Sequence, residues 1–309
     1  MNKLHLSKSK YCQCVQCIKM FWMRTYKKYC AAPKDKTAIF ENGHKVGELA
    51  KGLFGDYEDV PFDITLTPMI ERTNELLENK PNIITEASFS YDNNFCSVDI
   101  LKNDEDGVEI YEVKSSTSVH DIYLDDASYQ YYVLSNLGYN VKKVCIVYIN
   151  REYVKGKLPV EDELDKFFNI EDITDIALEK QDEIRNNIDM INRYMDEHGE
   201  YNEPIKELGM QCYEPYPCDF WDYCTRDLPK PNVFDVAEMR KNQKFKKYYE
   251  GKVSFEDLVN EDLNPKYLQQ IDFELNDNDP EINKEAIENL LNSLKYPLYF
   301  IDYESYNVP

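Results

Sequence analysis

The order of predicted elements along this 309-residue chain indicates an α/β fold with a mixed sheet flanked by helices. Helical patterns come first, three short strands follow them, and a helix and one further strand come next. An apolar content of 42% is enough for a sizeable core, and 30% charged residues without a low-complexity tract exclude a disordered chain. No apolar run approaches the roughly 18 residues of a membrane span, so no membrane partner is expected.

Capping residues mark the starts of the early helices. Ser7 or Ser9 can cap the first helix, and Thr67 as N-cap with Pro68 at the first helical position begins the third. The helices expected before the first strand span residues 7–28, 38–53 and 67–77.

The strands are predicted from runs rich in β-branched and aromatic residues with polar turns between them. A turn at residues 103–107 joins two of them as a hairpin, residues 125–137 are expected to be helical, and residues 172–198 form a helix of mixed charge. The predicted strands span residues 83–91, 95–101, 108–113 and 141–149.

Charge is distributed unevenly, although the chain as a whole carries −22. Residues 1–36 hold nine Lys or Arg and one acid, a net charge of +8, whereas residues 256–290 hold eleven acids and two lysines. Overall acidity argues against binding to phosphate, but the basic segment can attract it. Two interpretations of that segment stay open: its cations contact DNA phosphates beside a site, or they form a solvated helix face. The cations concerned are Lys8, Lys10, Lys19, Arg24 and Lys27.

The stretch FCSVDILKNDEDGVEIYEVKSS carries the clearest chemical pattern. Asp99 lies in one predicted strand, and Glu112 and Lys114 lie two residues apart in the next, so their side chains share a sheet face. Three ionisable groups on one face are unfavourable unless they hold a metal or one another. Two carboxylates suit Mg²⁺ or Mn²⁺, which activates phosphodiesters toward hydrolysis, with Lys114 orienting water. The alternative is an edge hairpin with exposed charges.

With Gln130 in the following helix, these residues resemble the PD-(D/E)XK core of RecB-type nucleases. The resemblance implies a restriction-endonuclease-like fold, with Asp99, Glu112, Lys114 and Gln130 as the catalytic set and Asp99 and Glu112 as metal ligands. Glu86 resembles the acidic residue that begins the preceding strand in this group, and is a candidate further ligand.

One departure from that group concerns an early helix. RecB-type enzymes often carry a metal-binding His four residues after a Gly, but here Gly43 is followed at that spacing by Gly47, and the His is His44. We expect His44 to be an ordinary helix residue.

The nine cysteines favour a metal or cluster site over disulfides, because the count is odd and no export signal is visible, which also favours a cytoplasmic location. Thiolate-rich sites suit Zn²⁺ or an iron–sulfur cluster. One early and three late cysteines resemble the four-cysteine 4Fe–4S site of AddB-type nucleases. Cys17-Ile18-Lys19-Met20-Phe21-Trp22 resembles the C-P-K-x-x-W element of one bacterial family and selects the early ligand. The implied ligands are Cys17, Cys212, Cys218 and Cys224.

A second motif lies near the end of the chain. Residues 299–301 open an apolar strand that ends in Asp302-x-Glu304, which resembles the first metal-binding motif of DEDD-type exonucleases. The layout resembles an uncharacterised bacterial family in which the two domains are fused. It implies a nuclease domain at 1–231, an acidic helical connector at 232–294 and the first strand of a truncated domain at 295–309.

Together these features predict a Mg²⁺- or Mn²⁺-dependent deoxyribonuclease. We expect an exonuclease that acts on single-stranded or end-exposed DNA in repair or defence. Two alternatives stay open: a non-catalytic nucleic-acid-binding or scaffold protein that keeps the nuclease fold, and a zinc-binding regulatory protein.

Overall fold

A seven-stranded mixed sheet organises the N-terminal part of the chain in this computed structural model, which describes residues 5–33, 37–205 and 207–304. The strands follow the order β2-β3-β4-β5-β6-β7, and β1 also pairs with β4. Pairing is parallel in β1–β4, β2–β3 and β5–β6 and antiparallel in the other neighbours. The predicted α/β fold is thereby confirmed. The strands are β1 (Leu6–Ser7), β2 (Glu58–Asp59), β3 (Ile83–Tyr91), β4 (Asn94–Asp104), β5 (Gly107–Lys114), β6 (Val141–Ile149) and β7 (Phe168–Asp172).

The two hairpins within the sheet are tighter than the sequence suggested. Asp92 and Asn93 join β3 to β4 with φ values of 46° and 65°, the left-handed geometry that two-residue hairpins use and that Asp and Asn tolerate. Only residues 105 and 106 separate β4 from β5. Gly107 begins β5 with φ 146°, and a Cβ there would lie 2.2 Å from the carbonyl oxygen of Asn140, so glycine is required.

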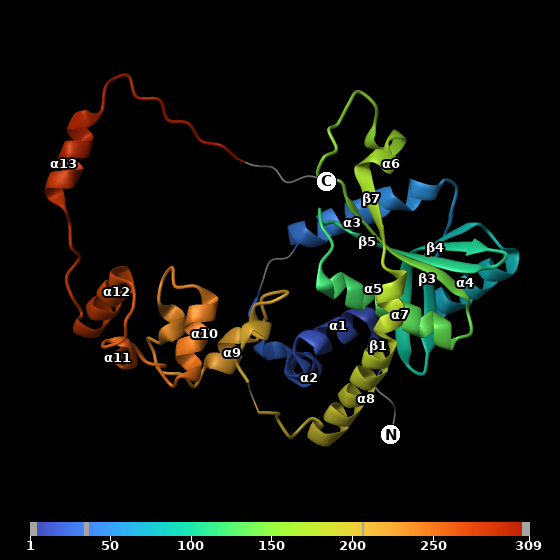
Figure 1. The fold of residues 1–309 in the computed structure, drawn as a ribbon, viewed down its shortest axis with the longest axis horizontal. Helices are drawn as coiled ribbons and strands as arrows, with labels where there is room; N and C mark the ends of the chain where they lie inside the picture. Colours follow the sequence, from blue (N-terminus) through green and yellow to red (C-terminus); the bar gives the residue numbers. More distant parts are fainter. Residues whose placement is uncertain (1–4, 34–36, 206, 305–309) are drawn as a thin grey trace. The chain divides into compact units, whose positions relative to one another are not determined.

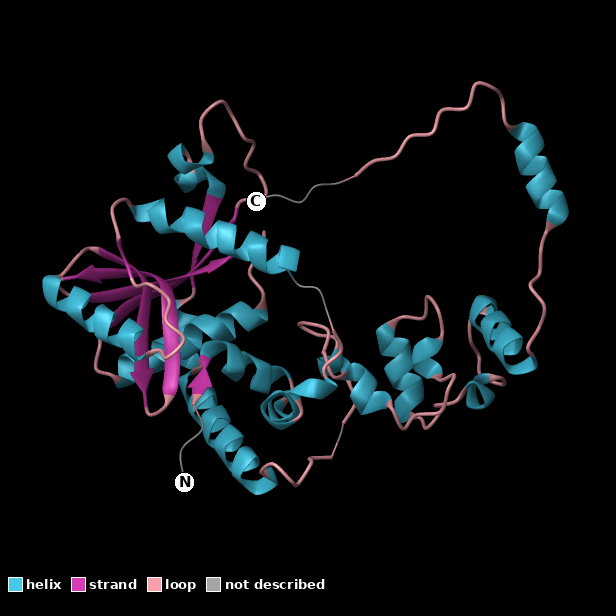
Figure 2. Cartoon of the chain, turned by 180° about the vertical axis from the view of Figure 1, so that it is seen from behind, coloured by secondary structure: helices cyan, strands magenta, loops and turns pink. Residues whose placement is uncertain are grey.

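Helices cover both faces of the sheet (Figures 1 and 2). Helix α5 crosses from β5 to the parallel strand β6 and packs on one face, and α3 packs on the other. Val46 and Ala50 of α3 join a buried cluster with Ile100 and Tyr111 of the sheet. The helices of this part are α1 (Lys8–Gln16), α2 (Ile18–Tyr26), α3 (Thr37–Lys51), α4 (Thr67–Asn79), α5 (Asp121–Asn136), α6 (Leu164–Phe167), α7 (Thr174–Glu179) and α8 (Gln181–His198).

Two helices predicted as continuous are each divided in the structure. The segment 7–28 forms α1 and α2, which separate at Cys17, where the backbone is extended (φ −162°, ψ 107°). Ser7 caps α1, as one of the two predicted alternatives. The segment 172–198 is divided at Lys180 into α7 and α8. Leu66 is the N-cap of helix α4, so the predicted N-cap, Thr67, is instead the first residue of the helix.

The described residues divide into two compact units. Unit 1 contains the sheet and extends to residue 205 together with residues 215–220, and unit 2 contains residues 207–214 and 221–304. Unit 2 is helical, with α9 (Trp221–Thr225), α10 (Lys241–Tyr249), α11 (Phe255–Leu258), α12 (Pro265–Asn276) and α13 (Lys284–Ser293).

Much of the predicted acidic connector has a core of its own. Val233, Val236, Phe255, Leu258 and Ile271 are buried together in unit 2. The predicted strand at 299–301 is wrong for the described residues, because this run is irregular and its three side chains are 69–92% exposed. Residues 305–309 of the predicted last segment lie outside the described residues.

One side chain of α4 completes the hydrogen bonding of β3. The buried hydroxyl of Thr73 donates to the carbonyl oxygen of Met69 at 2.9 Å and accepts the backbone N–H of Ser88 at 2.8 Å. A buried N–H without a partner is unfavourable, so this hydroxyl couples helix and strand.

Replacing Thr73 with Val therefore leaves the Ser88 N–H unsatisfied in the core. We expect Thr73→Val to lower the free energy of unfolding by about 1–3 kcal/mol, measured by urea denaturation. Thr73→Ser keeps the hydroxyl and serves as the matched control, with a smaller loss. Equal losses in the two variants would contradict the hydrogen-bond argument.

Candidate active site

The candidate site lies where β4 and β5 separate. Their ladder extends from Asp104↔Gly107 to Ile100↔Tyr111, and the next opposed residues are Asp99 and Glu112. At that point the carboxylate of Asp99 accepts the backbone N–H of Val113 at 2.7 Å, in place of a strand-to-strand bond. The two predicted carboxylates are therefore brought to one opening in the sheet.

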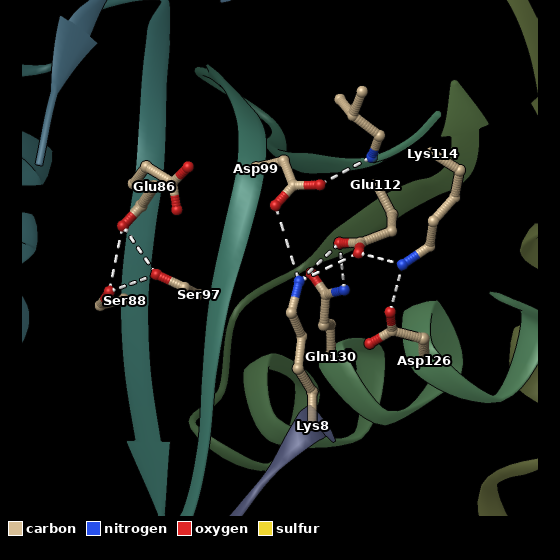
Figure 3. Close-up of polar contacts among 10 residues, drawn as sticks. Lys8, Glu86, Ser88, Ser97, Asp99, Glu112, Lys114, Asp126 and Gln130 are labelled. Carbon is tan, nitrogen blue, oxygen red and sulfur yellow. Dashed lines mark hydrogen bonds and ion pairs between the residues drawn. The ribbon is translucent and has the colours of Figure 1, made fainter. Parts of the chain in front are cut away.

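Glu112 is the most buried charge of the site, with 2% exposure. Figure 3 shows that three side chains from different elements contact its carboxylate. Lys114 Nζ lies 2.6 Å from Oε1, Gln130 Nε2 donates to Oε2 at 2.6 Å, and Lys8 Nζ lies 3.0 and 2.9 Å from the two oxygens. Val113, between Glu112 and Lys114, packs against the cluster under α3, as the strand alternation predicts.

Lys8 reaches the candidate site. Its ammonium group lies between the two carboxylates, 2.9 Å from Glu112 Oε2 and 3.6 Å from Asp99 Oδ1 (Figure 3). A cation in this position lowers the repulsion between the two nearby carboxylates.

Asp126 is a site residue that sequence reasoning missed. It is buried on α5 four residues before Gln130, so both side chains lie on the helix face toward β5, and it pairs with the ammonium of Lys114. The i,i+4 spacing from Gln130 was the available signal. Within the described part of the chain, Asp126 Oδ1 and Gln130 Oε1 have no hydrogen-bond partner.

The carboxylates of the site differ in proton affinity. Burial, followed by repulsion from Glu112, raises the pKa of Asp99 to about 7. Burial also acts to raise the pKa of Glu112, but the charges of Lys114 and Lys8 outweigh it and hold that pKa below the usual range. Burial would lower the pKa of Lys8, yet Asp99 and Glu112 raise it instead. In this site the carboxylate of Glu112 therefore stays ionised, whereas the neighbouring carboxylate of Asp99 protonates near neutral pH.

Glu86 lies on β3, where the flanking register pairs Thr85↔Ile100 and Ala87↔Val98 place it opposite Asp99. Its φ of 57° is unusual for a non-glycine residue in a strand and interrupts the ladder at this position. Burial raises the pKa of its carboxyl group. Glu86 thus lies next to the candidate site. Among the described residues, its carboxylate forms no hydrogen bond or ion pair with Lys8 or Glu112.

A cavity of about 360 Å³ opens beside Lys114 and Asp126. Its other walls come from α1, the start of α5 and the loop at Tyr216, and Gly43 of α3 also lines it. Lys114 Nζ lies 5.2 Å from the ring centre of Tyr123, one of the wall residues. A ligand in this cavity would reach Lys114 and Asp126, whereas Asp99 and Glu112 are not among the residues that line it.

Three other cations of the basic segment form ion pairs inside unit 1. Lys19, which is 7% exposed, lies 3.1 Å from Glu203, and Lys27 pairs with the same carboxylate. Arg24 lies 2.6 Å from Asp219. These half-buried or buried acids need compensating charge, which explains why the three cations face the protein.

Lys10 is exposed and donates to the carbonyl oxygen of His5 at 3.1 Å. Contact of the five named cations with DNA phosphates stays a prediction. Lys3, Lys34 and Lys36 of the basic segment lie outside the described residues.

The four predicted cluster cysteines are distributed over both units. Cys17 and Cys218 belong to unit 1, and Cys212 and Cys224 belong to unit 2. Within unit 1 the two cysteine-bearing segments contact each other, because the side-chain amide of Gln16 donates to the carbonyl oxygen of Tyr216 at 2.7 Å. Burial raises the pKa of Cys17. The four-cysteine site stays a prediction.

Two further sequence candidates are exposed. His44 lies on the outer side of α3, in keeping with an ordinary helix residue. Asp302 and Glu304 lie in an irregular segment rather than at a strand end.

Comparisons with protein-family models, curated proteins and solved structures found no match to this chain. In the described ranges, no group of three or more His, Cys, Asp or Glu side chains is arranged to hold a metal ion. None of the described helices combines the length and apolarity needed to cross a membrane.

The raised pKa of Asp99 predicts how the free energy of unfolding, measured in the presence of EDTA, changes with pH. The unfolded state releases this proton near pH 4 and the folded state near pH 7, so the unfolded state binds fewer protons in between and stability falls as pH rises. Asp99→Asn removes this dependence. Its stability relative to wild type should rise by up to about 4 kcal/mol between pH 4 and 8.

Urea denaturation across that pH range measures the difference. Asp106→Asn, an exposed change in the β4–β5 turn, is the control and should follow wild type. A constant difference between Asp99→Asn and wild type would show that Asp99 ionises normally.

Proposed function

We propose that this protein is a metal-dependent nuclease that hydrolyses DNA phosphodiester bonds at the Asp99–Glu112 site. One observation carries the proposal: two carboxylates from separating strands converge on a single cationic group, and Lys114 contacts the same glutamate. The E-x-K pattern and the upstream aspartate predict that Asp99, Glu112 and Lys114 share a sheet face, but they do not predict the contact to Lys8. The preference for DNA and for exonucleolytic cleavage rests on the resemblance to RecB-type PD-(D/E)XK enzymes.

The donor set fits a hard divalent cation. Mg²⁺ is usually held by one or two carboxylates, with water and substrate phosphate as its other ligands, so a two-carboxylate site is sufficient. Asp99 and Glu112 already hold a positive charge between them, and Asp99 is 25% exposed, which leaves the site accessible to ions. When bound there, Mg²⁺ or Mn²⁺ would supply Lewis-acid activation of the scissile phosphate and of water.

The remaining residues have roles that follow from their contacts. Lys114 is held between Glu112 and Asp126, so its ammonium is fixed where it can orient water and offset negative charge on the phosphate. Gln130 fixes Glu112 through a 2.6 Å hydrogen bond from α5. Asp126 acts through Lys114 and is a positioning residue.

One observation favours a second candidate, a non-catalytic protein that keeps this fold. The ammonium of Lys8 lies within ion-pair distance of both carboxylates, so the chain itself supplies a cation at this position. A nucleic-acid-binding or scaffold protein could retain such a closed charge network. Metal binding and cleavage separate this candidate from the nuclease.

The nuclease proposal predicts divalent-metal-dependent digestion of labelled nucleic acid. With Mg²⁺ or Mn²⁺, we expect cleavage of DNA and a loss of roughly a hundredfold or more in rate for Lys114→Ala and Glu112→Gln. Lys114→Ala removes the cation that would offset negative charge on the phosphate, and Glu112→Gln removes the charge of a carboxylate that would hold the metal. Single- and double-stranded DNA and RNA are compared side by side.

Lys143→Ala is the matched control, since Lys143 is an exposed lysine of β6 away from the carboxylates. It should cleave like wild type. Circular dichroism confirms that each variant is folded. If folded wild type, Lys114→Ala and Glu112→Gln give the same rate, the activity does not come from this site.

We also propose that Cys17, Cys212, Cys218 and Cys224 bind a 4Fe–4S cluster that stabilises the fold. The contact between the Cys17 and Cys218 segments of unit 1 supports it. Protein purified without oxygen should be brown and carry about four irons per chain. Cys17→Ser should lose this iron, whereas Cys30→Ser, outside the predicted ligand set, should retain it. Colourless wild-type protein with one zinc would support the zinc-binding alternative instead.

A further inference from the structure

We propose that Lys8 is a resident cation of the carboxylate pair, which occupies the metal position until a divalent ion replaces it. Binding of the ion and release of the Lys8 side chain are then one coupled event. This inference rests on the proposed function for the identity of the incoming ion, but it concerns a residue to which that function assigns no role.

The backbone around Lys8 is fixed from both sides. Leu6 and Ser7 form β1, which pairs in parallel with Asn94 and Phe95 of β4. The N–H of Leu6 donates to the carbonyl oxygen of Asn93 at 2.9 Å, and Ser7 caps the helix that Lys8 begins. The position of the Lys8 Cα is therefore determined by a strand and a helix cap.

The register explains why this segment reaches the site. β3 occupies one edge of β4 from residue 94 to residue 102, so β1 must pair with the other edge, which β5 also uses from residue 100 onward. β1 therefore pairs with residues 94 and 95 of that edge, where β5 is not paired. Lys8 follows directly and extends into the opening that contains Asp99 and Glu112.

The charge count favours replacement by a divalent ion. With all three carboxylates ionised, the contact network joins Asp99, Glu112 and Asp126 to two ammonium groups, Lys8 and Lys114, and so retains one negative charge. A divalent ion in place of Lys8 would bring the same network to neutrality. Buried networks with uncompensated charge are unfavourable, so this exchange has a driving force.

The Lys8 side chain is able to leave. The side chain is 18% exposed and has a flexible four-carbon stem. Its contacts in the network are to the two carboxylates that a metal would use. Lys114 differs, because its second contact to Asp126 on α5 would persist when an ion binds. Of the two ammonium groups, Lys8 is the one that exchange would release.

Two measurements on the full chain test the inference, and neither depends on cleavage. The first is Mn²⁺ affinity from calorimetry. Lys8→Met removes the competing cation and should bind Mn²⁺ roughly ten- to a hundredfold more tightly than wild type. The exposed Lys143→Met should not change the affinity.

The second measurement uses wild-type protein, so it holds even if Lys8→Met fails to fold. Acetylation of lysines is followed by mass spectrometry in EDTA and in saturating Mg²⁺, with Lys143 as the internal reference. Lys8 should be protected in EDTA and react several-fold faster with Mg²⁺. Unchanged labelling in protein that binds Mg²⁺ would overturn the inference.

The outcomes distinguish this inference from the proposed function. DNA cleavage with equal Mn²⁺ affinity in wild type and Lys8→Met overturns the role of Lys8 and leaves the nuclease intact. Tighter Mn²⁺ binding by Lys8→Met without cleavage supports the exchange and removes the nuclease. Absence of Mn²⁺ binding and of cleavage in every variant overturns both.

Discussion

The burial of Glu112 is the constraint on which the rest of unit 1 depends. A carboxylate at 2% exposure is tolerated only if its charge is paired and its oxygens are hydrogen-bonded. Here the donors come from α1, β5 and α5, and the donor from α1, Lys8, lies 104 residues before Glu112 in the sequence. Removing one partner of a buried pair typically costs about 3–5 kcal/mol, which is comparable with the total stability of many domains, about 5–15 kcal/mol. The compensation of Glu112 thus fixes where the N-terminal segment and α5 must lie, and the site is also a structural centre.

The same need for compensation changes the meaning of the basic N-terminal segment. Its charge of +8 suggested a surface for phosphate, yet Lys19, Arg24 and Lys27 pair with acids about 180 to 200 residues later in the chain. The segment therefore acts within unit 1 as a source of counter-ions for Glu203 and Asp219. Net charge along a sequence cannot reveal this, because it does not show which acids will be buried.

Much of the fold could be predicted from local patterns, since β3 and β6 have the predicted bounds and β4 and β5 differ only at their ends. Alternation in β5 was also sufficient to place Glu112 and Lys114 on one face. The contacts that complete the site were not predictable in this way. Lys8 enters through β1, a two-residue strand without a periodic signal, and only the register of β4 shows that its edge is free there. The break at Cys17 was missed because no Pro or Gly marks it. The only sequence feature that indicated Asp126 was its i,i+4 spacing from Gln130. That spacing places Asp126 in the site only if α5 is known to cross the face of β5.

The two lysines that contact Glu112 are not equivalent, and the difference follows from how each is anchored. Lys114 is on the same strand as Glu112 and is also held by Asp126, so it stays in place whatever occupies the space between the carboxylates. Lys8 is anchored only through its backbone and contacts the site from its flexible end. A site built in this way keeps its geometry in two states, one compensated internally by Lys8 and one compensated by an added cation. Because Glu112 retains Lys114 and Gln130 in both, exchange at the Lys8 position requires no rearrangement of the sheet, and the folded structure can be stable before any metal binds.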